Sequence, residues 1–382
     1  MTTGAETLMS SLRQTWPMPS KPRPITILGA GGIVRDGHLP AYRKMGLPVA
    51  GVYDVNVGVA RGLAADFGVP AVHETLEAAL AACGTAGIFD LALPPAAILS
   101  TVEKLPENSV ALIQKPLGPE GAAARRIVDA LDARSITAAT NFQLRFTPSM
   151  LAIRDAARRG LLGEIVDVEV RLAVYMPWEL WSFIPHLDAV EIPLHSIHYL
   201  DWIRSLIGEP ASVHAKSVRH PRYMNQADAR SSIILDYGDR VRCALSLNHT
   251  YNYGPEHTEA TIRVEGTKGA AHLTVGYLMD YTHPAPEKLE FITEGGRWTD
   301  LPLKGERVPD AFAPHGDVVE RMMYGFSVLH CLPVGMAETP SAETGAVMRR
   351  PTFRRYAEDA GFRRVDELPI DNDFYRFYRL TG

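Results

Sequence analysis

Short apolar segments alternate with alanine-rich segments over the first third of the chain. The apolar segments have the length of strands, and the segments between them space their apolar residues as helices do. Strands that alternate with helices are typical of βαβ units, in which the strands run parallel and the crossovers are right-handed. The pattern predicts a parallel sheet with strands at Ile25–Leu28, Val49–Tyr53, Ile88–Leu93, Val110–Ile113 and Ile136–Asn141. We expect the helices at Leu39–Met45, Val57–Phe67, Leu76–Ala82, Ala97–Lys104 and Gly121–Ala133.

The pattern changes after Thr147 and Pro148. A helix is predicted over Pro148–Arg159, and Gly160 ends it. Beyond this helix, apolar and polar residues alternate at the spacing of half-buried strands, and Tyr237-Gly238-Asp239 indicates a hairpin turn between two of them. We expect a second, α+β domain with an open, mostly antiparallel sheet, whose strands are Ile165–Val174, Val213–Val218, Ser231–Asp236, Val241–Asn248, Thr258–Glu265 and Ala270–Val275.

Composition and charge exclude several classes of protein. The chain has 382 residues, 46% of them hydrophobic, which excludes a disordered protein, and its net charge of −5 gives no sign of a nucleic-acid partner or an anionic membrane surface. The three cysteines are scattered and form no CxxC pair, so we expect a reducing compartment. There is no signal-peptide pattern and no apolar run near the ~18 residues that span a bilayer. We therefore expect a cytoplasmic protein.

A glycine turn follows the first predicted strand. In the segment Gly29-Ala-Gly31-Gly32-Ile33-Val34, Gly29 permits a tight turn and Gly31 allows the backbone to approach a pyrophosphate. The N–H groups that open the next helix, around Gly32 and Ile33, would face the anion. Val34 stands where the third glycine of the dinucleotide-binding fingerprint is usual. The alternative is an ordinary glycine-rich turn between a strand and a helix.

Asp54 ends the second predicted strand, at the distance where dinucleotide-binding domains place an acid for the adenosine ribose. A carboxylate there accepts both ribose hydroxyls and repels a 2′-phosphate, and the next residues, Val55 and Asn56, offer no cation for that phosphate. The sequence therefore favours NAD, with NADP possible. The alternative is a surface carboxylate.

These residues, with others further along, resemble the glucose–fructose oxidoreductase/inositol dehydrogenase family (Gfo/Idh/MocA). The resemblance covers about residues 23–312 and is carried by segments in the family's order and spacing, at Gly29–Val34, Leu91–Pro95, Gln114–Pro116, Asn141–Phe146 and His198–Arg204. It implies a Rossmann domain, an NAD or NADP cofactor, a carbinol of a sugar or cyclitol as the reacting group, and an open antiparallel sheet that often forms an oligomer interface.

The resemblance also implies roles for single residues. Pro94 and Pro95 would lie near the nicotinamide ribose. Lys115 would contact the cofactor and polarise the substrate oxygen, and His198 would act as acid and base. Two residues depart from the family pattern: Gln114 replaces the glutamate before the lysine, and Leu194 replaces the carboxylate four residues before the histidine. Glu191 could substitute for that carboxylate only if the local backbone differs.

The chemistry expected of Lys115 and His198 follows from their positions. Lys115 comes after a parallel strand, at the sheet edge where such folds bind ligands, and an ammonium there stabilises a developing alkoxide. His198 lies on a helix predicted over Ile192–Ile207, where a histidine can take the hydroxyl proton. His195 shares its face and is expected to bind substrate or tune its neighbour. The alternatives are a surface lysine and satisfied core histidines.

Glu191, His195 and His198 are residues of the metal-ligand type, but we expect no metal there. The carboxylate would precede the predicted helix, and no HExxH spacing occurs. Further substrate contacts are expected from Arg145, near the domain junction, and from Tyr175 and Trp178, although these aromatic side chains could equally close the domain interface.

The resemblance ends near Phe312. Residues 313–382 instead resemble the C-terminal end of a class I S-adenosylmethionine methyltransferase, but no second glycine turn follows to hold the methyl donor. We therefore divide the chain into an N-terminal arm (1–22), a dinucleotide-binding Rossmann domain (23–143), an α+β substrate and oligomerisation domain (144–312) and a methyltransferase-like C-terminal segment (313–382).

Together these features predict an NAD(P)-dependent dehydrogenase that acts on CH–OH groups of a sugar, cyclitol or related polyol, as a homo-oligomer. One alternative is a non-catalytic regulator of the same fold that senses NAD or a sugar. The other is a methyltransferase-related fusion.

Overall fold

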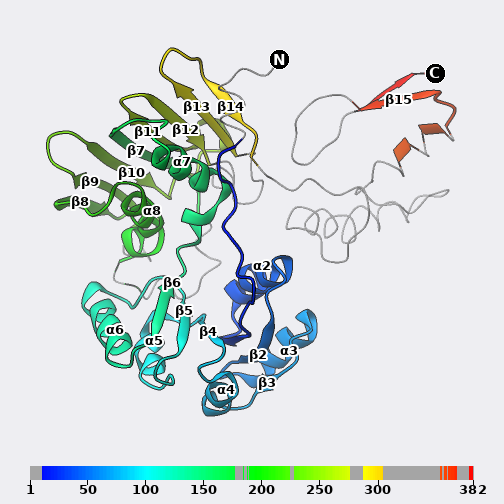
Figure 1. Cartoon of the computed structure of the whole chain (residues 1–382), viewed down its shortest axis with the longest axis vertical. Helices are drawn as coiled ribbons and strands as arrows, with labels where there is room; N and C mark the ends of the chain where they lie inside the picture. The colour runs from blue at the N-terminus through cyan, green and yellow to red at the C-terminus, as the bar shows by residue number, and fades with distance from the viewer. Residues whose placement is uncertain are drawn as a thin grey trace. The chain divides into compact units, whose positions relative to one another are not determined.

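The structure is a computed structural model, and it describes residues 11–176, 184, 187, 189–223, 228–275, 287–303, 353–354, 357–358, 360–367 and 378–381. The chain divides into two compact units, Met1–Leu303 and Lys304–Gly382 (Figure 1). The first unit contains two sheets, and the residues with candidate chemistry lie in it.

The first sheet is the parallel sheet that the sequence predicts, seen at the bottom of Figure 1. Its strand order is β3-β2-β1-β4-β5-β6, and every adjacent pair is parallel. The strands are β1 (Ile25–Leu28), β2 (Val49–Tyr53), β3 (Val72–His73), β4 (Ile88–Leu91), β5 (Val110–Ile113) and β6 (Thr137–Thr140). The five predicted strands are confirmed, and β3 is an additional two-residue strand.

Helices cover both faces of this sheet, which explains why β1 is buried along its whole length. One core cluster contains Leu28, Ile98 and Ile127, and a second, separate cluster contains Ile27 and Leu63. Since Ile27 and Leu28 are consecutive, their side chains point to opposite faces. The helical elements are η1 (Val34–His38), α2 (Leu39–Lys44), α3 (Val57–Phe67), α4 (Leu76–Cys83), α5 (Pro95–Val102) and α6 (Gly121–Ala133).

The second sheet is mostly antiparallel, as expected. Its order is β14-β13-β12-β11-β7-β10-β9-β8, and β7 and β10 are its one parallel pair. The strands are β7 (Ile165–Ala173), β8 (Ser212–Val218), β9 (Arg230–Asp236), β10 (Arg242–Asn248), β11 (Glu259–Gly266), β12 (Gly269–Thr274), β13 (Lys288–Thr293) and β14 (Thr299–Leu301). The sequence predicted the first six of these strands, and β13 and β14 extend the sheet. The short helix η6 (Pro255–His257) lies between β10 and β11, and η2 (Gln143–Phe146) lies between β6 of the first sheet and the helix that precedes β7.

Two helices cover one face of the second sheet. α7 (Pro148–Arg158) and α8 (Ile197–Ile207) contribute Met150, Ile153, Trp202 and Ile203 to a single core shared with the strands. Trp202 is fully buried in this core.

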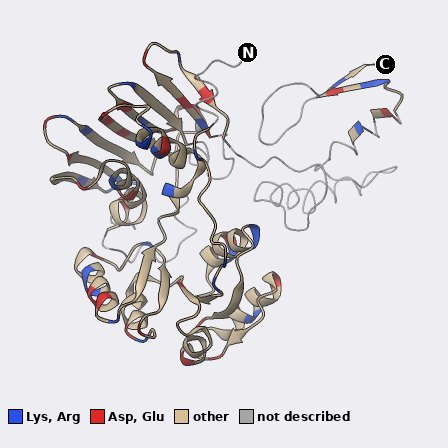
Figure 2. Ribbon diagram, viewed as in Figure 1, with Lys and Arg blue, Asp and Glu red and all other residues tan. Residues whose placement is uncertain are grey.

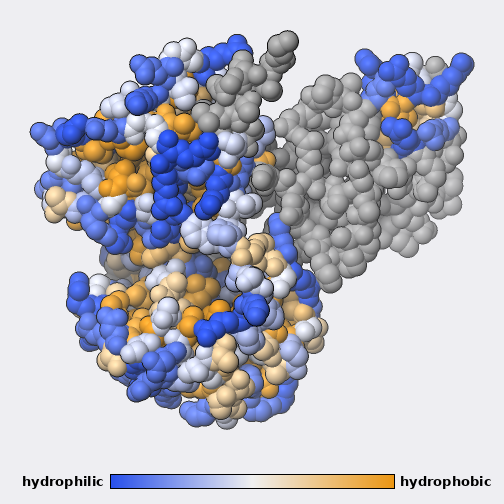
Figure 3. Space-filling view, viewed as in Figure 1, coloured by the Kyte–Doolittle hydropathy of each residue, from blue (hydrophilic) through white to orange (hydrophobic). Residues whose placement is uncertain are grey.

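The other face of the second sheet is largely charged. Glu169, Arg263, His272 and Glu290 are successive cross-strand partners on β7, β11, β12 and β13, and Arg263 forms an ion pair with Glu169 at 3.0 Å. Charges of both signs are interspersed over the described part of the chain in Figure 2. Figure 3 shows hydrophilic residues over most of the rim, with hydrophobic residues on part of the eight-stranded sheet. Among the described residues, no helix has the length and apolarity that crossing a membrane requires.

The described part of the N-terminal arm packs against the second domain rather than leading directly into the first. Leu12 belongs to the core of the second sheet. The Gln14 side chain donates to the carbonyl of Pro302 at 3.1 Å, and the ring of Trp16 meets that of Phe146 edge to face. The arm therefore packs the N-terminal part of the unit against the last strand of the second sheet.

The second unit contains a two-stranded antiparallel sheet, β15 (Arg364–Glu367) with β16 (Tyr378–Thr381). Residues 304–352 lie outside the described residues. The methyltransferase resemblance of residues 313–382 stays a prediction.

Candidate active site

The glycine turn connects β1 to η1, as the sequence predicts. Gly29 has φ +105°, and a Cβ there would lie 2.4 Å from the carbonyl oxygen of Ala92, so only glycine fits. A Cβ on Gly31 would meet no atom within 4 Å, which leaves its backbone open to a ligand. Ile33 is exposed, whereas Val34 is fully buried beneath the turn. Val34 therefore replaces the third glycine of the fingerprint with a side chain that packs on the side of the turn away from solvent.

Asp54 lies directly beside this turn. Its Oδ2 accepts a hydrogen bond from the backbone N–H of Ala30 at 2.8 Å, and its Oδ1 accepts one from Asn56 at 2.8 Å. A carboxylate oxygen has two lone pairs, so both oxygens keep acceptor capacity for a ribose. The side chain of Asn56 caps α3 by accepting from Gly58 and Val59, and Val55 is exposed.

Two proline-containing segments follow neighbouring strands at the carboxyl edge of the first sheet. Pro94 and Pro95 come after β4 and begin α5. Gln114, Lys115 and Pro116 follow β5, with a cis Lys115–Pro116 bond. Since β4 and β5 pair in parallel, both segments leave the sheet at one edge. This is where open α/β sheets bind ligands.

Lys115 connects the two domains of the first unit. Its Nζ donates a hydrogen bond to the carbonyl oxygen of Leu194, at 2.9 Å, in the segment that carries the histidines. Burial lowers the pKa of the Lys115 ammonium to about 8. A half-buried lysine with a lowered pKa at a sheet edge is the kind of group that active sites contain, and Lys115 is not an exposed surface lysine.

The helix that carries the histidines begins differently from the prediction. A helix was expected to start at Ile192, but a π-helical segment, η5, runs from Glu191 to Ser196 and continues as α8. The wider π turn includes Glu191 in the helix and sets it one turn before His195. Glu191 therefore belongs to the helix, whereas the sequence placed it before the helix, and its substitution for the carboxylate missing at Leu194 stays a prediction.

His198 lies on the first turn of α8. Its Nδ1 is buried and has no hydrogen-bond partner in the part of the chain that the structure describes. Its ring meets Phe142 edge to face, with centroids 6.1 Å apart. Burial, followed by the positive charges of Lys115 and His195, lowers the pKa of His198 to about 3. The imidazole is therefore neutral at neutral pH, which is the form that accepts a proton.

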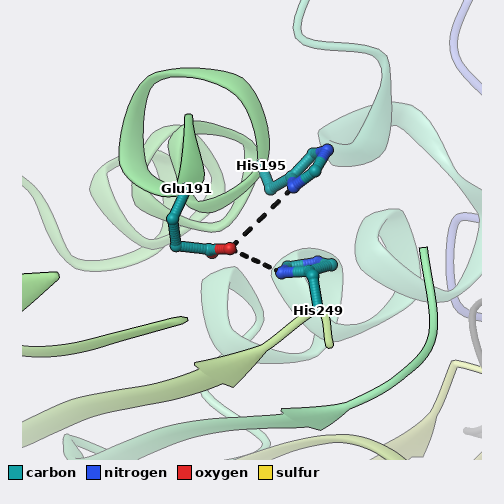
Figure 4. A group of neighbouring side chains, drawn as sticks. All are labelled: Glu191, His195 and His249. Carbon is teal, nitrogen blue, oxygen red and sulfur yellow. Dashed lines mark hydrogen bonds and ion pairs between the residues drawn. The ribbon is translucent and has the colours of Figure 1, made fainter. Parts of the chain in front are cut away.

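Glu191 lies between two histidines (Figure 4). Its Oε2 is 2.7 Å from Nδ1 of His249 and 3.9 Å from Nδ1 of His195, and the two rings are 4.4 Å apart. Burial alone would raise the pKa of Glu191, but the charge of His249 and hydrogen bonds from both histidines lower it to about 2. Burial and the charge of His249 lower the pKa of His195 to about 4.

No motif in the sequence pointed to His249. It follows β10, whose register with β7 and β9 brings it beside η5. No residue spacing connects positions 191 and 249, so only the strand order of the sheet could have revealed the contact.

Of the other predicted substrate residues, Arg145 and Tyr175 are described and Trp178 is not. Arg145, in η2, forms an ion pair with Asp201 of α8 at 3.0 Å. Tyr175 forms an isolated bridge with Thr250, next to His249. Trp178 lies outside the described residues.

A second buried polar cluster was also missed by the sequence analysis. His38 Nδ1 lies 2.7 Å from Asp90 Oδ2, which also accepts from the Tyr42 hydroxyl at 2.8 Å. The Asn141 amide lies 3.2 Å from the other ring nitrogen of His38. The cluster fixes the beginning of α2 to the connection that leads out of β6.

Comparisons with known proteins agree with this architecture. Residues 150–272 match the family model described as the GFO/IDH/MocA C-terminal domain. D-apiose dehydrogenase from Rhizobium rhizogenes is 25% identical over 213 residues, which are 54% of this chain and 61% of that relative, so the match spans less than two thirds of its length.

Solved structures share the fold at low identity. An oxidoreductase from Agrobacterium radiobacter in complex with NAD⁺, L-tartaric acid and magnesium has a TM-score of 0.63 at 20% identity, over 77% of this chain and 84% of that one. Levoglucosan dehydrogenase in complex with NADH and levoglucosan has a TM-score of 0.60 at 17% identity, over 73% and 80%. The second domain is thus similar to the GFO/IDH/MocA C-terminal domain over residues 150–272, and the parallel sheet that precedes it completes a fold that these solved structures share.

Proposed function

We propose that the protein is an NAD-dependent oxidoreductase that transfers a hydride between nicotinamide and a carbinol of a sugar, cyclitol or related polyol. The observation that carries the proposal is Lys115, a half-buried lysine at the carboxyl edge of the parallel sheet whose Nζ reaches the histidine-bearing segment of the second domain. The names of the relatives support it, since they include a D-apiose dehydrogenase and a levoglucosan dehydrogenase.

The residues of the first domain fit NAD. The backbone around Gly31 and Gly32 is open for a pyrophosphate, and Ile33 is exposed beside it. Asp54 is fixed by two backbone N–H groups and would accept the adenosine ribose hydroxyls. Pro94 and Pro95 would border the nicotinamide ribose. NAD⁺ and NADH are bound in the two related structures, which supports NAD over NADP.

Lys115 and His198 would share the chemistry of the alcohol. When NAD is bound, it supplies the acceptor for the hydride that leaves the carbinol carbon. The Lys115 ammonium would donate to the carbinol oxygen and stabilise the charge that develops there. His198, neutral and with an unpartnered buried Nδ1, would accept the hydroxyl proton. The reverse reaction would return the proton from His198 to the carbonyl oxygen.

The substrate would lie between the sheet edge and η5. His195, Arg145, Tyr175 and Trp178 are the further residues that we propose to contact it. We also propose that the protein forms a homo-oligomer through the open face of the second sheet. A cytoplasmic location and the absence of a nucleic-acid partner remain proposals as well. A regulator that binds NAD without turnover is the alternative, and the pairing of Lys115 with a histidine segment favours the enzyme.

The test is NADH formation, followed by absorbance, over a panel of aldoses, cyclitols and polyols. We expect turnover with at least one member, a preference for NAD over NADP, and loss of turnover in Lys115→Met. Lys104→Met is the matched control, because Lys104 is an exposed lysine of the same domain. NAD binding without turnover on every substrate would favour the regulator and reject the proposal.

A further inference from the structure

The cluster of Glu191, His195 and His249 combines three side chains of the metal-ligand type. One ligand atom from each lies within 4.8 Å of the others. Two of the residues come from η5 and the third follows β10, so the group is assembled by the fold of the second domain. Two histidines with one carboxylate are a donor set that first-row transition-metal dications use.

The separations suit a bound ion. Two ligand atoms each ~2.1 Å from a metal lie about 3.0 Å apart at a right angle and about 3.4 Å apart at the tetrahedral angle. Glu191 Oε2 lies 2.7 Å from His249 Nδ1 and 3.9 Å from His195 Nδ1, values that bracket this range. Side-chain shifts well below 1 Å would bring both pairs into it.

The surroundings hold the carboxylate in the way that metal ligands are held. Ser196 donates its hydroxyl to Oε1 of Glu191 at 2.9 Å, which leaves Oε2 for an ion. Asp228 accepts from the backbone N–H groups of Val190 and Glu191 at 2.6 and 3.0 Å and fixes the start of η5. The Glu191 side chain is fully buried, whereas that of His195 is 17% exposed, so the cluster is closed on the carboxylate side and accessible at His195.

We propose that Glu191, His195 and His249 bind a divalent first-row transition-metal ion, with Zn²⁺ as the probe of choice. A single buried carboxylate balances half of the charge of the ion, and the imidazoles bind it in their neutral form. Three protein ligands leave at least one coordination position for water or a substrate oxygen. Leu194, which accepts the hydrogen bond from Lys115, is adjacent to His195, so the ion would lie at the edge of the proposed substrate site.

The experiment measures metal binding without reference to turnover. Full-length protein would be stripped with EDTA, titrated with Zn²⁺ by calorimetry, and its metal content measured by mass spectrometry after gel filtration. We expect one equivalent per chain, and visible absorption bands of a histidine-ligated ion when Co²⁺ replaces Zn²⁺. His249→Gln and Glu191→Gln should each weaken Zn²⁺ binding at least ~100-fold, since losing even a residue that supports a ligand costs 10–100-fold.

His272→Gln is the matched control. His272 lies 3.8 Å from Glu290 on the second sheet, so it is also a histidine beside a carboxylate, and its substitution should leave the affinity unchanged. Circular dichroism and NAD affinity would show that each variant folds. If His249→Gln does not fold, His195→Gln and the Co²⁺ spectrum of the wild type replace it.

Less than one equivalent in the wild type, or equal affinities in His249→Gln and His272→Gln, would overturn the proposal and leave a hydrogen-bonded His–Glu–His set. NAD binding and turnover by such a protein would leave the proposed function intact. Conversely, a full equivalent of Zn²⁺ without NAD binding would support the metal site and reject the oxidoreductase.

Discussion

The glycine turn and the histidine cluster are the two polar regions of the first unit with candidate chemistry, and they are assembled in opposite ways. The turn from Gly29 to Ile33 and the acid Asp54 belong to consecutive strands of one sheet, and Asp54 reaches the turn through the backbone of Ala30. The histidine cluster combines η5 with His249 of the second domain, and Lys115 of the first domain reaches η5 through the carbonyl oxygen of Leu194.

The two regions also differ in burial, and this difference predicts how substitutions act. Asp54 is only half-buried, and its ligand-binding capacity comes from geometry and open lone pairs. The Glu191 side chain is fully buried, and burial lowers the pKa of the half-buried Lys115, so these charges interact strongly with their surroundings. We therefore expect substitutions at the glycine turn to have small effects on turnover and stability, and substitutions of Lys115 and the histidines to have large ones.

The largest effect is expected from Lys115→Met. The variant keeps the length of the side chain and removes the ammonium that would stabilise the alkoxide, so kcat should fall by ~10²–10³-fold with little change in the Kd for NAD. Steady-state NADH formation and equilibrium binding of NAD would measure both. If kcat fell less than threefold, Lys115 would have no role in the chemistry. The expected difference between the effects of substitutions at the histidine cluster and at the glycine turn would then be absent.

His198→Ala should have the second largest effect on turnover. We expect kcat to fall by ~10²-fold, the lower end of what general acid–base catalysis contributes, and added imidazole should restore part of the rate in the cavity that the variant leaves. A parallel His195→Ala variant separates the two histidines, since our assignment gives His195 a contact with substrate rather than the proton. Greater loss of kcat in His195→Ala than in His198→Ala would move the acid–base role to the histidine that contacts Glu191.

The difference in assembly also explains what the sequence could predict. The five longer strands of the Rossmann domain, the glycine turn and Asp54 depend on local patterns, and the structure has them where expected. β3 was missed because two residues carry no periodicity, and β13 and β14 were not assigned from the pattern after Val275.

At the histidine cluster, prediction failed for a different reason. A π turn differs from an α turn by one residue per hydrogen bond, and nothing in the spacing of apolar residues from 191 to 207 distinguishes the two. The sequence therefore placed Glu191 before the helix and weighed His198 as a metal ligand, whereas the structure sets His249 beside Glu191. Contacts of this kind depend on sheet register, which a single sequence does not specify.

A third prediction concerns stability and uses the same variant, Lys115→Met. The folded pKa of Lys115, about 8, lies below its ordinary value of 10.5, so burying the charged form opposes folding. The penalty is fully present below pH 8, is about 3 kcal/mol, and disappears as the pH rises from 8 to 10.5. Loss of the hydrogen bond to Leu194 costs about 1 kcal/mol.

Lys115→Met should therefore be more stable than the wild type by about 2 kcal/mol at pH 7, from the difference of these two terms. Urea denaturation at pH 7 and at pH 10 would measure the gain, which should shrink at the higher pH. Lys104→Met, which replaces an exposed lysine, should change the free energy of unfolding little at either pH. A Lys115→Met variant less stable than the wild type at pH 7 would show that the ammonium stabilises the fold.

The smallest effect is expected at the glycine turn, from Asp54→Asn. The amide keeps one oxygen acceptor for a backbone N–H but removes the charge that would hold the ribose hydroxyls and repel a 2′-phosphate. We expect the Kd for NAD to rise ~10-fold, or about 1.4 kcal/mol, and the Kd for NADP to stay constant or fall. Asp66→Asn is the control, because Asp66 is an exposed carboxylate of the same domain that pairs with Arg35. Fluorescence titration with both cofactors would measure the change.

Because no buried charge loses its partner at Asp54, the Tm of Asp54→Asn should move by no more than a few degrees. A large fall in Tm would show that folding of the glycine turn depends on its acid. Tighter binding of NADP than of NAD by the wild type would contradict the assignment of Asp54 to the ribose.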